Sequence, residues 1–137
     1  MYSDDFSSFE PKYFLDLAHE LYENRDNLNS NSSAIERTIV SRTYYATFLH
    51  VLKWLEENTD YKSNGSGDHT KIPNYIYKNL QKPMKFVRKD IRDKLITLKY
   101  NRVKCDYYFE IPDKNNQNYN LTIEDLFKYA EYILKFF

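Results

Sequence analysis

Apolar residues recur at every third or fourth position through most of this chain, and glycine and proline interrupt the pattern in only a few places. Two glycines and four prolines occur in 137 residues, and no stretch alternates apolar and polar residues as a half-buried strand does. The pattern therefore predicts long helices separated by breaks at 29–33, 64–67, Pro83 and 112–120. The five predicted helices span about 11–28, 34–60, 68–80, 83–109 and 122–137.

Residues that open or cap helices stand near the predicted starts. These are Pro11, Ser33 with Glu36, Asp68, and Thr122 with Asp125. The segment 34–60 is apolar around most of its circumference, which is typical of the central helix of a bundle. We therefore expect an all-α protein, an antiparallel four- to five-helix bundle that forms a single domain over residues 1–137.

Charge and composition exclude several classes of function. Twenty basic and twenty acidic residues give a net charge of zero, so contact with nucleic acid or anionic lipid requires a local cluster of charge. No run approaches the roughly 18 apolar residues of a membrane helix, and the acidic start MYSDDFSSFE is unlike a signal peptide. The single cysteine, Cys105, forms no internal disulfide and favours a cytoplasmic location, without a membrane partner.

The sequence carries no cofactor signature. The only glycines, Gly65 and Gly67, are too few for a dinucleotide-binding fingerprint or a phosphate-binding loop. Histidines His19, His50 and His69 form no metal-binding pair at helical spacing, so we expect no metal. We interpret His19 as half-exposed, His50 as packed and neutral, His69 as a turn residue without chemistry, and Cys105 as an inert core thiol.

Two arginines occupy positions that the helical period assigns to packed faces. Arg42 follows Ile35 by seven residues, and Arg102 follows Leu95 by seven. A guanidinium carries five donors and keeps its proton, so it is rarely buried without an anionic partner. Asp106 lies one turn after Arg102 and can reach it. Four tyrosines lie near them along the helices: Tyr44, Tyr45, Tyr107 and Tyr108.

Two interpretations of these arginines remain open. In one, both face a common anion site in which tyrosines stack on bases or donate hydrogen bonds. In the other, a buried Arg–Asp–Tyr network fixes the register of the helices and binds nothing. The charged run 85–94 also has two interpretations. It is a solvated helix face, or it is a surface that binds phosphate, although Asp90 and Asp93 would weaken the binding of phosphate.

Several short motifs occur in a set order along the chain. The stretch SRTYYATF lies at 41–48 in the second predicted helix, and GSGDH at 65–69 forms a link and a histidine that open the next. In NRVKCDY at 101–107 an arginine is followed by Asp-Tyr, and a closing amphipathic helix surrounds Ala130. In sequence and order these motifs resemble the HEPN family (higher eukaryotes and prokaryotes nucleotide-binding), and the resemblance spans about 11–137.

The resemblance implies a dimerising helical bundle, often a metal-independent ribonuclease of toxin–antitoxin, phage-defence or CRISPR-associated systems. Other members are non-catalytic partners of minimal nucleotidyltransferases or bind nucleotides. In ribonuclease members an arginine is followed, after four to six residues, by a histidine. Here the positions after Arg102 hold Tyr107, Tyr108 and Phe109, and no histidine follows His69. Tyrosine, with a free pKa of about 10, is a poor base at neutral pH.

Three functional hypotheses follow. The first is an RNA- or nucleotide-binding protein of a toxin–antitoxin or defence system, with Arg42, Tyr45, Arg102 and Asp106 as its binding residues. The second is a metal-independent endoribonuclease that uses Arg102 with His69 or Tyr107. The third is a non-catalytic helical dimerisation or interaction protein. In each case we expect a homodimer, and the resemblance adds a nucleotidyltransferase as a partner protein.

Overall fold

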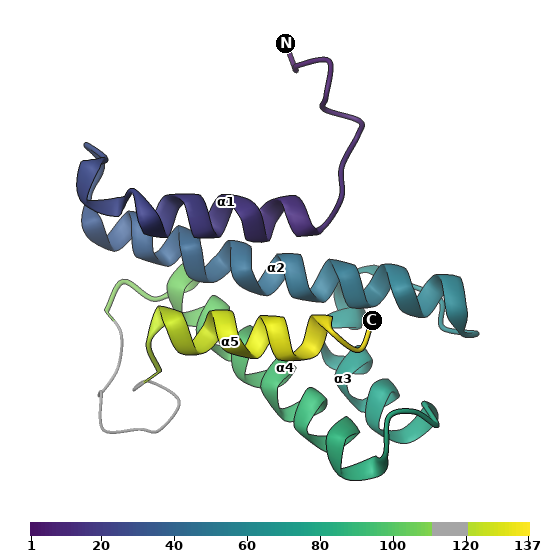
Figure 1. Ribbon diagram of the computed structural model, residues 1–137. Helices are drawn as coiled ribbons and strands as arrows, with labels where there is room; N and C mark the ends of the chain where they lie inside the picture. The colour runs from purple at the N-terminus through teal and green to yellow at the C-terminus, as the bar shows by residue number, and fades with distance from the viewer. Residues whose placement is uncertain (111–120) are drawn as a thin grey trace.

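The computed structural model describes residues 1–110 and 121–137, and it is built from helices (Figure 1). The all-α prediction is confirmed, and the described residues contain no strand. The break predicted at 112–120 lies outside the described residues. The helices are α1 Lys12–Glu23, α2 Ser32–Asn58, α3 Asp68–Asn79, α4 Lys85–Tyr107 and α5 Ile123–Leu134, with 3₁₀ turns at Arg25–Asn27 and Gly65–Gly67.

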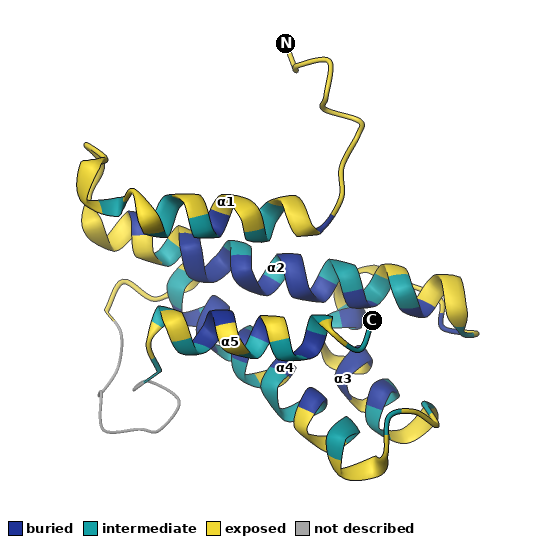
Figure 2. Ribbon diagram, viewed as in Figure 1, coloured by how far each residue is buried: buried dark blue, intermediate teal, exposed yellow. Residues whose placement is uncertain are grey.

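Helix α2 is the central element, as its apolar circumference predicts. It packs against α1 on one side and against α4 and α5 on the other, and α3 packs against α4 (Figure 1). Buried residues therefore occur around most of its middle portion (Figure 2). No helix in the described ranges combines the length and apolar character needed to cross a bilayer.

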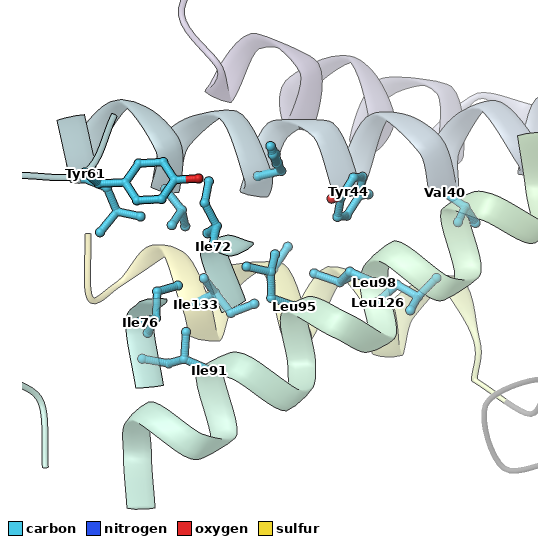
Figure 3. Packing of buried hydrophobic residues seen from close by; sticks show 14 residues of the cluster. Val40, Tyr44, Tyr61, Ile72, Ile76, Ile91, Leu95, Leu98, Leu126 and Ile133 are labelled. Atoms are coloured by element: carbon cyan, nitrogen blue, oxygen red, sulfur yellow. The ribbon is translucent and has the colours of Figure 1, made fainter. Parts of the chain in front are cut away.

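The main core lies between α2, α3, α4 and α5 (Figure 3). Ile72 of α3, Leu95 and Leu98 of α4 and Ile133 of α5 are at most 2% exposed and belong to one cluster with Tyr44 of α2. Burial of such side chains stabilises the fold by about 1.5–3 kcal/mol each. A second, smaller cluster holds α1 onto α2 and α5 and consists of Ala18, Ile35, Ile39 and Phe127.

Two predicted helix boundaries are wrong. Helix α1 ends at Glu23, and Leu28, which we expected within it, is extended and 38% exposed. The N-cap of α2 is Asn31, not Ser33: its Oδ1 accepts from the amides of Ser33 at 2.9 Å and Ala34 at 3.2 Å. Since Asn31 satisfies these first donors, Ser33 lies inside the first turn.

Helix α3 also begins differently from the prediction. Asp68 is its first residue, not a cap, and its buried carboxylate accepts from the Tyr61 hydroxyl at 2.5 Å and the Ser63 hydroxyl at 2.5 Å. Burial raises the pKa of Asp68, but these hydrogen bonds outweigh it and hold the pKa below its usual value. Pro73 lies in the second turn of α3, and because it has no N–H, the His69 carbonyl receives no helical bond from it.

Side-chain hydrogen bonds to backbone groups close the C-terminal end of α4 and the N-terminal end of α5. Met84 and Phe109, which we expected within the helix 83–109, flank α4 and are 59% and 101% exposed. Instead of Phe109, Arg37 closes this end by donating to the carbonyls of Cys105, Tyr108 and Phe109. The capping box predicted at the start of α5 is confirmed: Thr122 and Asp125 exchange two hydrogen bonds of 3.1 Å.

Candidate functional site

The polar residues that periodicity places on packed faces gather where the middle of α2 meets the start of α3 and the C-terminal half of α4. Tyr44 and Tyr45 come from α2, His69 from the first turn of α3, and Arg102 from α4. Aromatic, hydrogen-bond and charge contacts connect them. We call this group the arginine–tyrosine cluster; it consists of Arg42, Tyr44, Tyr45, His69, Arg102 and Asp106.

Arg102 is the buried cation of the cluster. Its side chain is 7% exposed, and its Cζ lies 5.2 Å from the ring centroids of both Tyr44 and Tyr45. Nη1 lies 3.7 Å from Oδ2 of Asp106, the predicted contact one turn away, which is a charge contact too long for a hydrogen bond. Nε is buried without a hydrogen-bond partner among the described residues. Arg102 therefore retains an unused donor.

Arg42 approaches the same tyrosine ring. Its Cζ lies 5.1 Å from the Tyr45 centroid and 4.5 Å from that of Phe14. Its Nη2 donates to the Ser41 hydroxyl at 3.3 Å, and that hydroxyl donates to Oδ2 of Asp106 at 3.3 Å. The two guanidiniums thus share Tyr45 and are both linked to Asp106. They do not point to opposite surfaces of the molecule.

Tyr44 and His69 form the polar contact at the centre. The Tyr44 hydroxyl and Nδ1 of His69 are 2.6 Å apart, and the imidazole stacks on Phe48 at 4.2 Å. Burial raises the pKa of Tyr44. The pKa of His69 is lowered, mainly by burial and secondly by the positive charges of Arg102 and Lys99. The negative charge of Asp68 acts in the opposite direction and raises it. A protonated tyrosine and a neutral histidine allow two arrangements: the hydroxyl donates to Nδ1 and the imidazole proton lies on Nε2, or Nδ1–H donates to the hydroxyl oxygen. We expect the first arrangement.

The structure brings together five of the six residues that the sequence singled out. Tyr107 is the exception: it ends α4, is 69% exposed, and has no described contact with the cluster. His69, expected to be a turn residue without chemistry, contacts Tyr44 and Phe48. Sequence analysis placed Tyr44 near the arginines but gave it no role. Its position four residues before Phe48 on a buried face was the signal, since a buried tyrosine hydroxyl needs a partner.

The remaining titratable residues lie apart from the cluster. His19 is 37% exposed, stacks on Phe127 at 4.1 Å and lies 3.9 Å from Glu131, as expected of a half-exposed surface residue. Burial raises the pKa of the Cys105 thiol, against the nearby charges of Arg37 and Lys104, which disfavours the reactive thiolate. Among residues 1–110 and 121–137, no three His, Cys, Asp or Glu side chains gather as a metal site would require.

Comparisons of the chain with protein-family models, with curated proteins and with solved structures found no match. Functional conclusions about this chain therefore rest on the arginine–tyrosine cluster itself.

Proposed function

We propose that this chain is a HEPN-like RNA- or nucleotide-binding protein of a toxin–antitoxin or defence system, and that the arginine–tyrosine cluster is its binding site. One observation carries the proposal: the Nε donor of the buried Arg102 guanidinium has no hydrogen-bond partner among the described residues. Burial of a permanent charge is costly unless an anion offsets it. Asp106 offsets it only in part, because its side chain is 30% exposed and 3.7 Å away.

The chemistry of the cluster favours a phosphate next to a nucleobase. Two guanidiniums suit phosphate, since each presents a planar fork of donors. The half-buried Tyr45 ring, which both arginines contact, offers an aromatic surface on which a base can stack. Arg42 is half-buried and approachable, whereas Arg102 supplies charge from behind the ring. The proton on Nε2 makes His69 a further donor to a phosphate oxygen.

The placement of the family-like motifs supports the HEPN assignment. The 41–48 motif lies in the middle of α2, the 65–69 motif forms the entry to α3, and the 101–107 motif ends α4. These three stretches, far apart in sequence, contribute Tyr45, His69 and Arg102 to one cluster. We also propose, on the resemblance, that the protein forms a homodimer and pairs with a nucleotidyltransferase. Light scattering that gives a single 16.7 kDa species at micromolar concentration would contradict the dimer.

The ribonuclease alternative draws on the same contacts but lacks a base. Arg102 and His69 both contact Tyr44, so they are near enough to act on one phosphate. However, in the expected arrangement the Tyr44 hydroxyl donates to Nδ1 of His69 and Nε2 carries the proton, so neither ring nitrogen is free to accept the proton of a 2′-hydroxyl. Tyr107 has no contact with the cluster. Binding without cleavage is therefore the function that the geometry favours.

The test compares binding and cleavage in one set of variants. Labelled tRNA and mixed RNA are incubated without metal with the wild type, Arg102→Ala, Arg42→Ala and Arg25→Ala. Arg25 is the matched control, because it also packs on a tyrosine ring, 4.0 Å from Tyr22, but lies outside the cluster. We expect the wild type and the control to bind intact RNA, and both cluster variants to bind about tenfold to a hundredfold more weakly.

Two results would overturn the proposal. Cleavage that disappears in Arg102→Ala and His69→Ala would support the endoribonuclease. A lower melting temperature in Arg102→Ala with unchanged RNA binding, measured below that temperature, would support the purely structural network. Removal of one partner of a fully buried ion pair costs about 3–5 kcal/mol, and the partial exposure of Asp106 places the loss here below that range.

A further inference from the structure

The α3–α4 hairpin concentrates positive charge in a chain whose net charge is zero. Residues 71–94 contain eight Lys or Arg and two Asp, a net charge of +6, so the rest of the sequence carries −6. The far end of this hairpin projects away from α1 (Figure 1), and much of its surface is exposed (Figure 2). Asp93, one of the two acidic residues, is already paired with Lys89 at 3.3 Å and Arg92 at 3.0 Å. The hairpin is thus an electropositive surface.

The outer face of α3 forms a hollow between two lysines of this surface. The hollow has a volume of about 320 Å³, and its lining includes Lys71, Asn74, Tyr75 and Lys78, which share one face of the helix. The two lysines are roughly 10 Å apart along the helix axis. Both are exposed, and in the described part of the chain neither has a carboxylate within ion-pair distance. The ring of Tyr75, which lies between the two lysines in the sequence, makes an edge contact with the ring of Tyr61, with 5.0 Å between the ring centroids.

Adjacency in the chain and one hydrogen bond link the hollow to the arginine–tyrosine cluster. Thr70 lines the hollow and directly follows His69 of the cluster. Lys99 of α4 donates to the Thr70 hydroxyl at 3.5 Å, lies one turn before Arg102, and its charge acts on His69. Cationic groups therefore run from Arg102 through Lys99 to the two lysines of the hollow.

We propose that this face of α3 is a docking track for the phosphate backbone of single-stranded RNA that leaves the arginine–tyrosine cluster. The inference rests on the proposed function and names its substrate: an RNA several nucleotides long rather than a mononucleotide. Lysines pair with successive phosphates, while Tyr75 and Asn74 meet the unstacked base between them. An anionic membrane fits the hollow less well, because a membrane-binding surface needs exposed apolar side chains beside its lysines. The hollow is lined by polar and tyrosine side chains, and the exposed Met84 and Phe86 lie outside its lining, at the start of α4.

Lys71→Gln/Lys78→Gln tests the track, with Lys12→Gln/Lys128→Gln as the control. The control removes two lysines that are equally exposed but lie on α1 and α5. Fluorescence anisotropy gives the affinity of each protein for a labelled trinucleotide and for a labelled 20-nucleotide unstructured RNA at several salt concentrations. Circular dichroism confirms that each variant is as helical as the wild type.

We expect the wild type to bind the 20-nucleotide RNA more tightly than the trinucleotide. In Lys71→Gln/Lys78→Gln the slope of log K against log[salt] for the long RNA falls by about 1.4, or about 0.7 for each lost phosphate contact. The trinucleotide affinity of this variant and both affinities of the control stay at the wild-type values.

Other outcomes overturn the track in distinguishable ways. Suppose that the trinucleotide binds but the long RNA binds no more tightly, or that the salt slope for the long RNA is the same in Lys71→Gln/Lys78→Gln as in the wild type. The track is then wrong, and the proposed function stands. If neither RNA binds, both proposals fail together. If only vesicles rich in phosphatidylserine bind, and Lys71→Gln/Lys78→Gln abolishes that binding, the face recognises a membrane instead.

Discussion

Replacement of Tyr44 by Phe tests the polar contact at the centre of the cluster. The substitution removes one hydroxyl and leaves the ring, which is 1% exposed and packs against Phe48 and Arg102. The hydroxyl lies 2.6 Å from Nδ1 of His69. Since His69 is half-buried, Nδ1 then loses its partner with little access to water. The variant therefore removes the hydrogen bonds of one hydroxyl, to His69 and to Arg102, without creating a large cavity.

The expected loss of stability is modest but measurable. A neutral hydrogen bond contributes about 0.5–1.5 kcal/mol net, and an unsatisfied acceptor left behind brings the cost to about 1–2 kcal/mol. For a chain of 137 residues, that corresponds to a decrease of roughly 3–7 °C in melting temperature. Differential scanning calorimetry at pH 7.5 measures it. Tyr45→Phe is the control, because that hydroxyl has no described hydrogen bond although its ring lies 6.0 Å from the imidazole of His69.

The pKa of His69 tests the direction of the same hydrogen bond. The wild-type pKa lies below the ordinary value of 6.5, so the unfolded state binds more protons than the native state below that pH. The free energy of unfolding consequently decreases as the pH falls through 6.5. A donor to Nδ1 stabilises the neutral imidazole, so Tyr44→Phe raises the pKa of His69 and weakens this acid dependence.

Proton NMR titration of the His69 ring signals measures that pKa in the wild type and in both tyrosine variants. A fall in the pKa of Tyr44→Phe would refute the assignment, since it would mean that His69 donates from Nδ1 to the Tyr44 oxygen. Nε2 would then be free to accept a proton, and the case for a ribonuclease would be restored. An equal change in Tyr45→Phe would show that the effect is not specific to the hydrogen bond.

Three further predictions concern the fold. Leu98→Ala removes a side chain that is 1% exposed and should lower the free energy of unfolding in urea by about 2–5 kcal/mol, whereas the neighbouring Ile96→Ala, 46% exposed, should cost less than about 1 kcal/mol; equal losses would contradict the packing. Thr122→Ala breaks the capping box of α5 and should cost about 1 kcal/mol, and an unchanged melting temperature would show that the box contributes nothing. Cys105, whose pKa burial raises, should react with iodoacetamide much more slowly at pH 8 than in guanidinium; comparable rates would exclude an inert thiol.

The sequence predicted the helices well because their signal is repeated many times. Each stripe of apolar residues in α2, α4 and α5 contains several buried positions, so one misplaced residue does not change the pattern. The ends were harder, since a cap depends on one side chain. Asn31 replaced Ser33 because its carboxamide accepts from the amides of Ser33 and Ala34, two residues earlier than a Ser33 cap would. Phe109 was misplaced because the period continues past the point at which Arg37 closes the helix.

The site was predictable only in part, for a similar reason. Arg42 and Arg102 stood out as charges on apolar faces, and the i,i+4 contact with Asp106 follows from helix geometry alone. The contact between Tyr44 and His69 joins residues 25 apart across two helices, and no local period encodes how α3 turns back against α2. Tyr107 was misjudged because the last turn of α4 extends beyond the core, where its side chain meets solvent.

The opposed charges of the α3–α4 hairpin and the rest of the chain give an electrically neutral molecule a dipole. The acidic remainder repels an approaching polyanion, and the lysine-bearing end attracts it. The electric field therefore orients the polyanion toward the hairpin before any contact forms. This electrostatic orientation raises the association rate. It weakens once added salt makes the Debye length shorter than the distance between the basic hairpin and the acidic remainder. A polyanion therefore approaches preferentially from the side of the α3–α4 hairpin, although the net charge of the chain is zero.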